Sequence, residues 1–212
     1  MFLKKINPQL NQALAESGFS TPSELQKETF SPIKSGADLI IQSSEKSGKS
    51  TTIAINVIHR LDKALEQSPR ALIIVQNKEK VLEMVNIFDT LNLHNKLRIY
   101  HTYEQTDIDN DKNLISVGID VLIGTPKKLH ELFSGAGFDI NRLKIFIIDD
   151  LDIILKSRHE QIISRLANAN EKVQKVFFTS VITDKVEVLA DSLMLDPTFL
   201  ETDSEEEEEF QD

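Results

Sequence analysis

Residues 48–50, Gly48-Lys49-Ser50, stand between a short apolar run (residues 39–41) and a helix-compatible segment (residues 53–65). Strand, loop and helix in this order are the context of a phosphate-binding loop, because N–H groups of the loop and of the first helical turn converge on an anion. Lys49 would add a charge there, and the Ser50 hydroxyl could bind Mg²⁺. The competing interpretation is a solvated loop rich in Ser and Lys. The full pattern G-x-x-x-x-G-K-[ST] has Gly where this chain has Ser43.

A second group of chemically able residues is Asp149-Asp150-Leu151-Asp152, which follows the apolar run 145–148. A carboxylate at the tip of a buried strand can hold Mg²⁺ opposite the hydroxyl of a phosphate loop, and a neighbouring acid can orient or deprotonate the attacking water. We therefore expect Asp149 to be a metal ligand with Ser50, and Asp149 and Asp150 to be catalytic. The competing interpretation is that these acids cap a helix. The phosphate loop and the strand register favour the interpretation as metal-binding and catalytic residues.

The elements that must position these groups alternate between strand-like and helix-like segments. Several strand candidates are continuous apolar runs, which indicates burial on both faces of a parallel sheet. We predict an α/β fold, a doubly wound, mostly parallel sheet flanked by helices. The strand candidates are residues 38–42, 71–76, 97–101, 121–124, 143–148 and 175–179, and the helix candidates between them are residues 49–65, 78–91, 112–117, 126–133, 159–169 and 184–194.

Two leading helices precede the sheet within residues 1–36. Asn7 is the expected N-cap of the first, with Pro8 after it, and Thr21 with Glu24 forms a capping-box pattern for the second. We expect one domain over residues 1–200 and a disordered acidic tail over residues 201–212. In a doubly wound fold, ligands bind at the carboxyl ends of the strands. The candidate residues do follow the strand candidates.

The charge of the chain is concentrated in the tail. Eight acidic residues and no basic ones lie between Glu201 and Asp212, so residues 1–200 carry a formal charge of −2, against −10 for the whole chain. The tail is interpreted either as a solubilising end or as a handle for a basic partner. The chain has no cysteine, which excludes disulfides and thiolate metal sites. No apolar run reaches ~20 residues and no signal peptide is evident, so we expect a cytoplasmic protein without a membrane partner.

The order and spacing of these segments, from about residue 2 to residue 195, resemble the first RecA-like domain of DEAD-box RNA helicases. Residues 18–26 resemble the adenine-reading Q motif of that family. The resemblance implies a P-loop NTPase domain that binds ATP or ADP with Mg²⁺. Gln26 would read the adenine edge, and Phe2, with Phe19 in the motif, would supply aromatic contacts. Ser47, Gly48, Lys49, Ser50 and Thr51 would hold the phosphates.

The remaining motifs are present in position but altered. Lys46 stands where the family has Gly, beside an additional anion at Glu45, and Asp150 stands where it has the catalytic Glu. A missing Gly matters if the backbone there needs a positive φ. Asp is shorter than Glu by one methylene, roughly 1.5 Å, and ~1 Å displacements of a catalytic group can cost ~100-fold. By the same resemblance, Asp152, Thr179 and Ser180 would couple the motifs, while Lys78, Thr125 and Lys128 would contact an RNA backbone.

The resemblance covers only the first half of a DEAD-box helicase, and the second RecA-like domain would supply the arginine finger. We therefore expect nucleotide binding with weak or no ATPase activity, weak contact with single-stranded RNA, and no complete helicase from this chain alone. The alternative is a pseudoenzyme that serves as an interaction module. Its partner would bind the acidic tail or be a separate second RecA-like domain.

Overall fold

The computed structural model describes residues 3–65 and 68–202. Within these ranges the chain forms seven strands and nine helices. The strands are β1 (Leu39–Ser43), β2 (Ala71–Ile74), β3 (Ile99–Thr102), β4 (Val121–Gly124), β5 (Ile145–Ile148), β6 (Gln174–Thr179) and β7 (Thr198–Thr202). The helices are α1 (Pro8–Glu16), α2 (Glu24–Ser35), α3 (Lys49–Leu61), α4 (Lys78–Leu91), α5 (Ile108–Ser116), α6 (Pro126–Ser134), α7 (Leu151–Lys156), α8 (Glu160–Asn168) and α9 (Asp184–Leu193).

The seven strands make one sheet in the order β3-β4-β2-β5-β6-β1-β7. Each neighbouring pair is parallel. The predicted doubly wound α/β fold is therefore confirmed, and the sheet is all-parallel in the described residues. In such a sheet every strand ends at the same edge, so the loops after the strands share one side of the molecule.

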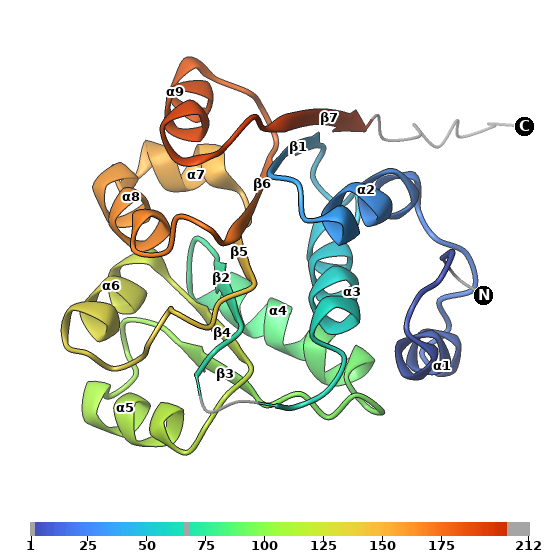
Figure 1. Ribbon diagram of the computed structural model, residues 1–212, viewed down its shortest axis with the longest axis horizontal. Coiled ribbons are helices and arrows are strands. Elements are labelled where there is room, and N and C mark those ends of the chain that lie inside the picture. The colour runs from blue at the N-terminus through green and yellow to red at the C-terminus, as the bar shows by residue number, and fades with distance from the viewer. Residues whose placement is uncertain (1–2, 66–67, 203–212) are drawn as a thin grey trace, which may run out of the picture.

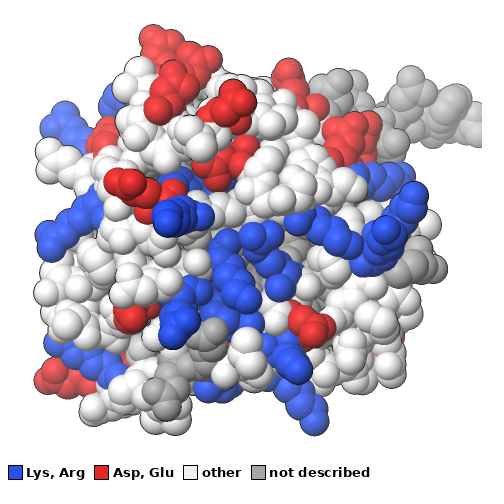
Figure 2. All heavy atoms as spheres, in the orientation of Figure 1, with Lys and Arg blue, Asp and Glu red and all other residues white. Residues whose placement is uncertain are grey.

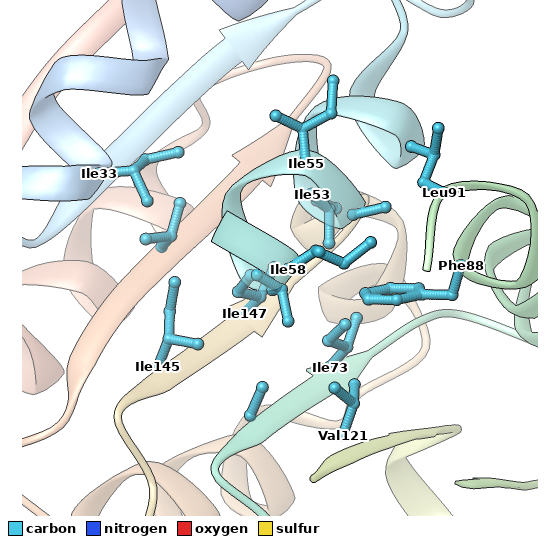
Figure 3. Packing of buried hydrophobic residues seen from close by; sticks show 14 of the residues in the cluster. Ile33, Ile53, Ile55, Ile58, Ile73, Phe88, Leu91, Val121, Ile145 and Ile147 are labelled. Atoms are coloured by element: carbon cyan, nitrogen blue, oxygen red, sulfur yellow. The ribbon is translucent and has the colours of Figure 1, made fainter. Parts of the chain in front are cut away.

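Successive residues of each central strand pack on opposite faces of the sheet, because side chains alternate along a strand. Ile145 and Ile147 of β5 belong to the cluster under α1 to α4, whereas Phe146 and Ile148 belong to the cluster under α5 to α9. Figure 1 shows α1, α2 and α3 on one side of the sheet and α5, α6, α8 and α9 on the other. In the first cluster, Ile53 and Ile58 of α3 pack near Ile147 and Phe88 (Figure 3).

The helix boundaries differ from the sequence prediction by more than one residue at three places. The N-cap of α2 is Ser23 rather than Thr21, and its capping-box partner is Gln26 rather than Glu24. Helix α5 begins four residues before the predicted position because the side chain of Asp107 accepts the N–H of Asn110. Helix α3 ends at Leu61 rather than at residue 65. The next residue, Asp62, is its C-cap and has a φ of 64°.

Two elements were not predicted, namely the short helix α7 and the strand β7. Strand β7 lies beside β1 at the sheet edge, and Ser43 pairs with Thr202. Glu201 and Thr202, which were assigned to the acidic tail, are thus part of the sheet. The predicted tail residues 203–212 lie outside the described residues. Among the described helices, none has the length and apolarity that a membrane span needs.

Candidate functional site

A pocket of about 260 Å³ opens at the carboxyl ends of β1 and β5. It brings together the loop before α3 and the acidic residues after β5, as the sequence predicted. Its lining residues are Lys46, Gly48, Lys49, Ser50, Thr51, Lys80, Glu83, Ile87, Asp149 and Asp150.

The loop before α3 contains two residues with left-handed backbone geometry. Gly48, the N-cap of α3, has a φ of 87°, and Lys46 has a φ of 66°. The position where the DEAD-box pattern has Gly therefore does need a positive φ, and this chain meets the need with a strained Lys. Glu45 is exposed and is not one of the residues that line the pocket. Its carboxylate therefore does not border the pocket.

Lys49 connects the ends of three strands. Its side chain is buried, and Nζ lies 2.7 Å from Oδ1 of Asp150, after β5. The same Nζ donates a 3.2 Å hydrogen bond to Oγ of Ser180, after β6. Asp150 itself has a φ of 52° at the N-terminus of α7. An incoming anion would therefore have to share Lys49 with a carboxylate that already neutralises it.

Asp149 has a buried carboxylate whose hydrogen-bonding capacity is only partly satisfied. Its side chain is 3% exposed, and Oδ1 has no hydrogen-bond partner. Burial, followed by the charge of Asp150, raises the pKa of Asp149 to about 7. The hydroxyls of Ser43, Ser44 and Ser47 are likewise buried and unpaired.

These unpaired oxygens fit a site for Mg²⁺ and phosphate. Mg²⁺ in nucleotide sites is held by one or two carboxylates together with phosphate oxygens and water, rather than by a complete protein cage. Asp149 and Ser50 border the same pocket and could supply the protein ligands. Within the described residues no group of three or more His, Asp or Glu side chains could hold a metal ion unaided. A metal ion at this site would therefore need phosphate oxygens as additional ligands.

The residues expected to couple the motifs lie in contact. Oδ1 of Asp152 accepts hydrogen bonds from Oγ1 of Thr179 at 3.1 Å and from the N–H of Ser180 at 3.2 Å. Ser180 in turn accepts from Lys49. A chain of polar contacts therefore runs from Asp152 through Ser180 to the phosphate loop. Val181 next to it is half-exposed.

The Q-motif residue Gln26 lies beside the phosphate loop. Its side chain is 5% exposed, Oε1 accepts the N–H of Ser23, and Nε2 would be 3.9 Å from a Cβ placed on Gly48. Gln26 is therefore not a solvent-exposed helix residue. Phe19 packs on the core under α1 to α4. Phe2 lies outside the described residues.

The three residues expected to contact RNA are in different environments. Lys78 is exposed, with Nζ 5.1 Å from the centre of the Tyr103 ring. Thr125 is fully buried, and its Oγ1 has no hydrogen-bond partner. Lys128 is 4% exposed, and its Nζ donates to the carbonyl of Thr106 at 2.7 Å. Only Lys78 presents its side chain to a ligand in this conformation. Lys128 thus lies in a buried polar cluster, and its contact with RNA stays a prediction.

Sequence reasoning missed the pocket residues on α4, which are Ile87 and the charged pair Lys80 and Glu83. Nζ of Lys80 lies 2.9 Å from Oε2 of Glu83. This hydrogen bond, together with the charges of Asp150 and Asp149, raises the pKa of Lys80. Their i, i+3 spacing on a helix that begins just after β2 was the available signal. It does not distinguish a site from an ordinary surface pair.

Comparison with known proteins gives consistent matches over most of the chain. A family model described as DEAD/DEAH box helicase matches residues 23–189. The ATP-dependent RNA helicase eIF4A of Lodderomyces elongisporus is 25% identical over 193 residues, which cover 91% of this chain and 48% of the relative. Eukaryotic initiation factor 4A of Caenorhabditis elegans is 23% identical over 194 residues, with the same two shares. The chain spans about half the length of the curated relatives it matches.

Two solved structures share the fold. A DEAD box protein from Methanococcus jannaschii superposes with a TM-score of 0.88 at 19% identity, covering 93% of this chain and 54% of that one. A hypothetical ATP-dependent RNA helicase from Sulfolobus tokodaii gives a TM-score of 0.84 at 18% identity, covering 93% and 57%. The predicted RecA-like fold is thereby confirmed. With the family match over residues 23–189, the comparisons establish that this chain belongs to the DEAD/DEAH box helicase family.

Proposed function

We propose that this chain is a nucleotide-binding domain that binds ATP or ADP with Mg²⁺ and hydrolyses ATP slowly or not at all. The observation that carries the proposal is the convergence of Lys49, Ser50 and the unpaired Asp149 on one pocket beside Gln26. Gln26 would bind the adenine, because an amide donates and accepts at once. The N–H groups at the start of α3 and Lys49 would bind the phosphates.

The Mg²⁺ ion would polarise the phosphates and offset their charge, and Asp149 with Ser50 would hold it. Without the ion, burial opposes the charged form of Asp149. A divalent cation next to Asp149 would favour the carboxylate, so nucleotide and metal would bind together. Asp150 would have to leave Lys49 before it could act on a water molecule.

Three features support weak hydrolysis. Asp150 reaches less far than the Glu of the family pattern and is held by Lys49 at 2.7 Å. No arginine is among the described residues that line the pocket. An arginine finger is worth ~10³–10⁵ in the rate of nucleotide hydrolysis. A second RecA-like domain would be the source of one.

Contact with single-stranded RNA would be weak, because Lys78 is the one predicted contact residue with an exposed side chain. Strong nonspecific binding needs several phosphate contacts. Neither unwinding nor a full RNA site is proposed for this chain alone.

Calorimetry with Mg-ADP tests the nucleotide site. Wild type is expected to bind, and Lys49→Ala is expected to lose detectable binding. Asp150→Asn is expected to bind more tightly than wild type, because the phosphates no longer compete with a carboxylate for Lys49. Lys185→Gln on α9 is a matched loss of one positive charge outside the pocket, and its affinity should equal that of wild type. Absence of binding to wild type at millimolar Mg-ADP would overturn the proposal.

A further inference from the structure

A second pocket, of about 340 Å³, lies at the amino ends of the strands, opposite the phosphate loop. The last turns of α2 and α3 and the residue just before β5 form it. Its lining residues are Ile33, Lys34, Asn56, His59, Arg60 and Lys144. No acidic residue is among the described residues that line it. Lys and Arg side chains gather in the middle of the face that Figure 2 shows.

Two of the donors at this pocket are held in place by Phe30. The ring of His59 lies with its centre 4.9 Å from that of Phe30, and Nζ of Lys34 lies 5.5 Å from the same ring centre. Nζ of Lys34 also donates to the carbonyl of Lys5 at 3.1 Å. Because Phe30 is buried, these contacts order side chains that would otherwise be mobile. The pocket is therefore preorganised on this side.

The His59 ring is neutral and has one donor left. The backbone N–H of Asn7 donates to its Nδ1 at 3.1 Å, so in the neutral ring the proton resides on Nε2. Burial, and then the nearby charge of Lys34, lower the pKa of His59, while the more weakly felt Asp62 opposes this shift. The ring thus contributes a neutral N–H donor to a positively charged pocket.

Among the described residues that line this pocket, none is an acid that could pair with Arg60. Its Nε is buried without a hydrogen-bond partner, and burial lowers the pKa of its guanidinium. The guanidinium lies beside Gly36, since a Cβ at that position would be 3.9 Å from Nη2. The partial negative charge at the C-terminus of α2 accounts for a cation at this place. It does not account for Lys144, which reaches the same pocket from the strand side of the molecule.

We propose that this pocket binds a small phosphate-bearing anion through Lys34, Arg60, Lys144 and the Nε2–H of His59. A phosphate group accepts several charge-assisted hydrogen bonds at once, which a single carboxylate does less well. The volume is at the lower end of the range for small-molecule sites. A phosphate on a small organic group fits this size, whereas an extended polyanion would need an open groove. The inference is independent of the nucleotide site, which lies at the other ends of the strands.

The test is an NMR titration of the ¹⁵N-labelled full chain with inorganic phosphate, against sodium chloride at equal ionic strength. The amides of Gly36 and His59 report on this pocket, and the amide of Gly48 reports on the phosphate loop. Saturable shifts at Gly36 and His59 are expected in wild type. Arg60→Gln and the exposed Lys144→Gln are each expected to weaken them about tenfold, equivalent to ~1.4 kcal/mol. Lys185→Gln, on the other side of the sheet, should have no effect.

Two further ligands identify the source of the phosphate. Tighter binding of glycerol phosphate than of inorganic phosphate would support a phosphomonoester, and equal binding would support recognition of the phosphate group alone. The proposal is overturned if phosphate at tens of millimolar gives no saturable shift at Gly36 and His59. It is also overturned if a uridine oligonucleotide shifts them and both small phosphates do not. Shifts at Gly48 alone would support the nucleotide site and count against this one.

Discussion

At the scale of single residues, Lys46 carries a backbone conformation that suits glycine. Its φ of 66° costs an L-residue roughly 1 kcal/mol, and glycine avoids this cost. We predict that Lys46→Gly leaves the free energy of unfolding unchanged or raises it by up to ~1 kcal/mol. The measurement is urea denaturation.

The matched control for Lys46 is Lys27, which is exposed within α2. There, Lys27→Gly is expected to lower the free energy of unfolding by ~1 kcal/mol, because glycine is a poor helix former. Equal losses for the two variants would show that Lys46 is not strained.

The second residue-scale prediction concerns Asp149 and pH, in the absence of nucleotide and metal. Its pKa is raised to about 7 from the ordinary value of 3.8 by burial and by Asp150. A raised pKa means that the folded state holds the proton more tightly than the unfolded state. The stabilising contribution of Asp149 to the free energy of unfolding should therefore be fully present below about pH 4 and be lost progressively until about pH 7. The total loss is roughly 4 kcal/mol at 1.36 kcal/mol per unit of pKa.

Asp149→Asn removes this titration while it keeps an acceptor for the N–H of Asp150. We predict that wild type and variant differ increasingly as the pH rises from 4 to 7, with the variant more stable at neutral pH. Denaturation curves at successive pH values in EDTA measure this, and Asp89→Asn on the exposed side of α4 is the control. Parallel pH profiles for Asp149→Asn and wild type would contradict the prediction.

At the scale of elements, a buried carboxylate joins β3, α5 and α6. Asp111 accepts hydrogen bonds from Tyr100, Thr102 and Thr106 at 2.7 to 2.8 Å, and Nζ of Lys128 lies 3.6 Å from its Oδ2. Burial and the contact with Asp111 raise the pKa of Tyr100. Lys128 thus supplies the positive charge that faces the Asp111 carboxylate in this cluster. The cluster fixes the start of α6 against the edge of the sheet.

We predict that Lys128→Gln lowers the free energy of unfolding by about 1.5–3 kcal/mol, because it removes a buried charged hydrogen bond. Lys78→Gln, also at the start of a helix after a strand, should stay within about 0.5 kcal/mol of wild type. RNA affinity should respond in the opposite way, because Lys78→Gln should weaken it and Lys128→Gln should leave it unchanged. Loss of RNA affinity in a stably folded Lys128→Gln would contradict this assignment.

At the scale of the whole molecule, β7 completes the sheet beside β1. We predict that a chain ending at Thr202 unfolds within about 0.5 kcal/mol of the full chain, because the core lies within the described residues. A chain ending at Pro197 should lose at least about 2 kcal/mol, since it gives up the β7 ladder and exposes the edge of β1. Thermal or urea denaturation of the three chains measures this, and equal stabilities of the two truncated chains would contradict it.

Much of this architecture can be read from local sequence. Buried parallel strands are apolar runs such as residues 145–148, and the phosphate loop and acidic box both follow such runs. Strand β7 could not be read this way, because it is a half-exposed edge strand whose acid Glu201 resembles the tail after it. Its partner β1 is distant in sequence.

Site residues could be predicted where residue type and position after a strand point to the same role. They could not be predicted where tertiary contacts decide the environment of the side chain. The residue types and spacing of Gly48, Lys49 and Asp149 were enough to predict that they lie together at one pocket. The burial of Lys128 depends on Asp111, which lies on another element, and a lysine at a helix start reads as solvated. Lys80 and Glu83 reach the pocket only because α4 packs against α3. Such placements follow from tertiary packing.

The strand order has a consequence for how the protein is made. Strand β1 leads into the phosphate loop, yet both of its neighbours, β6 and β7, come from the last part of the described chain. During vectorial synthesis, β1 must wait with two unpaired edges until residues 174–202 have left the ribosome. Such non-local parallel pairing slows folding and exposes apolar strands to aggregation. The loop that we propose to bind phosphate is therefore fixed in place among the last, and nascent chains should depend on chaperones until then.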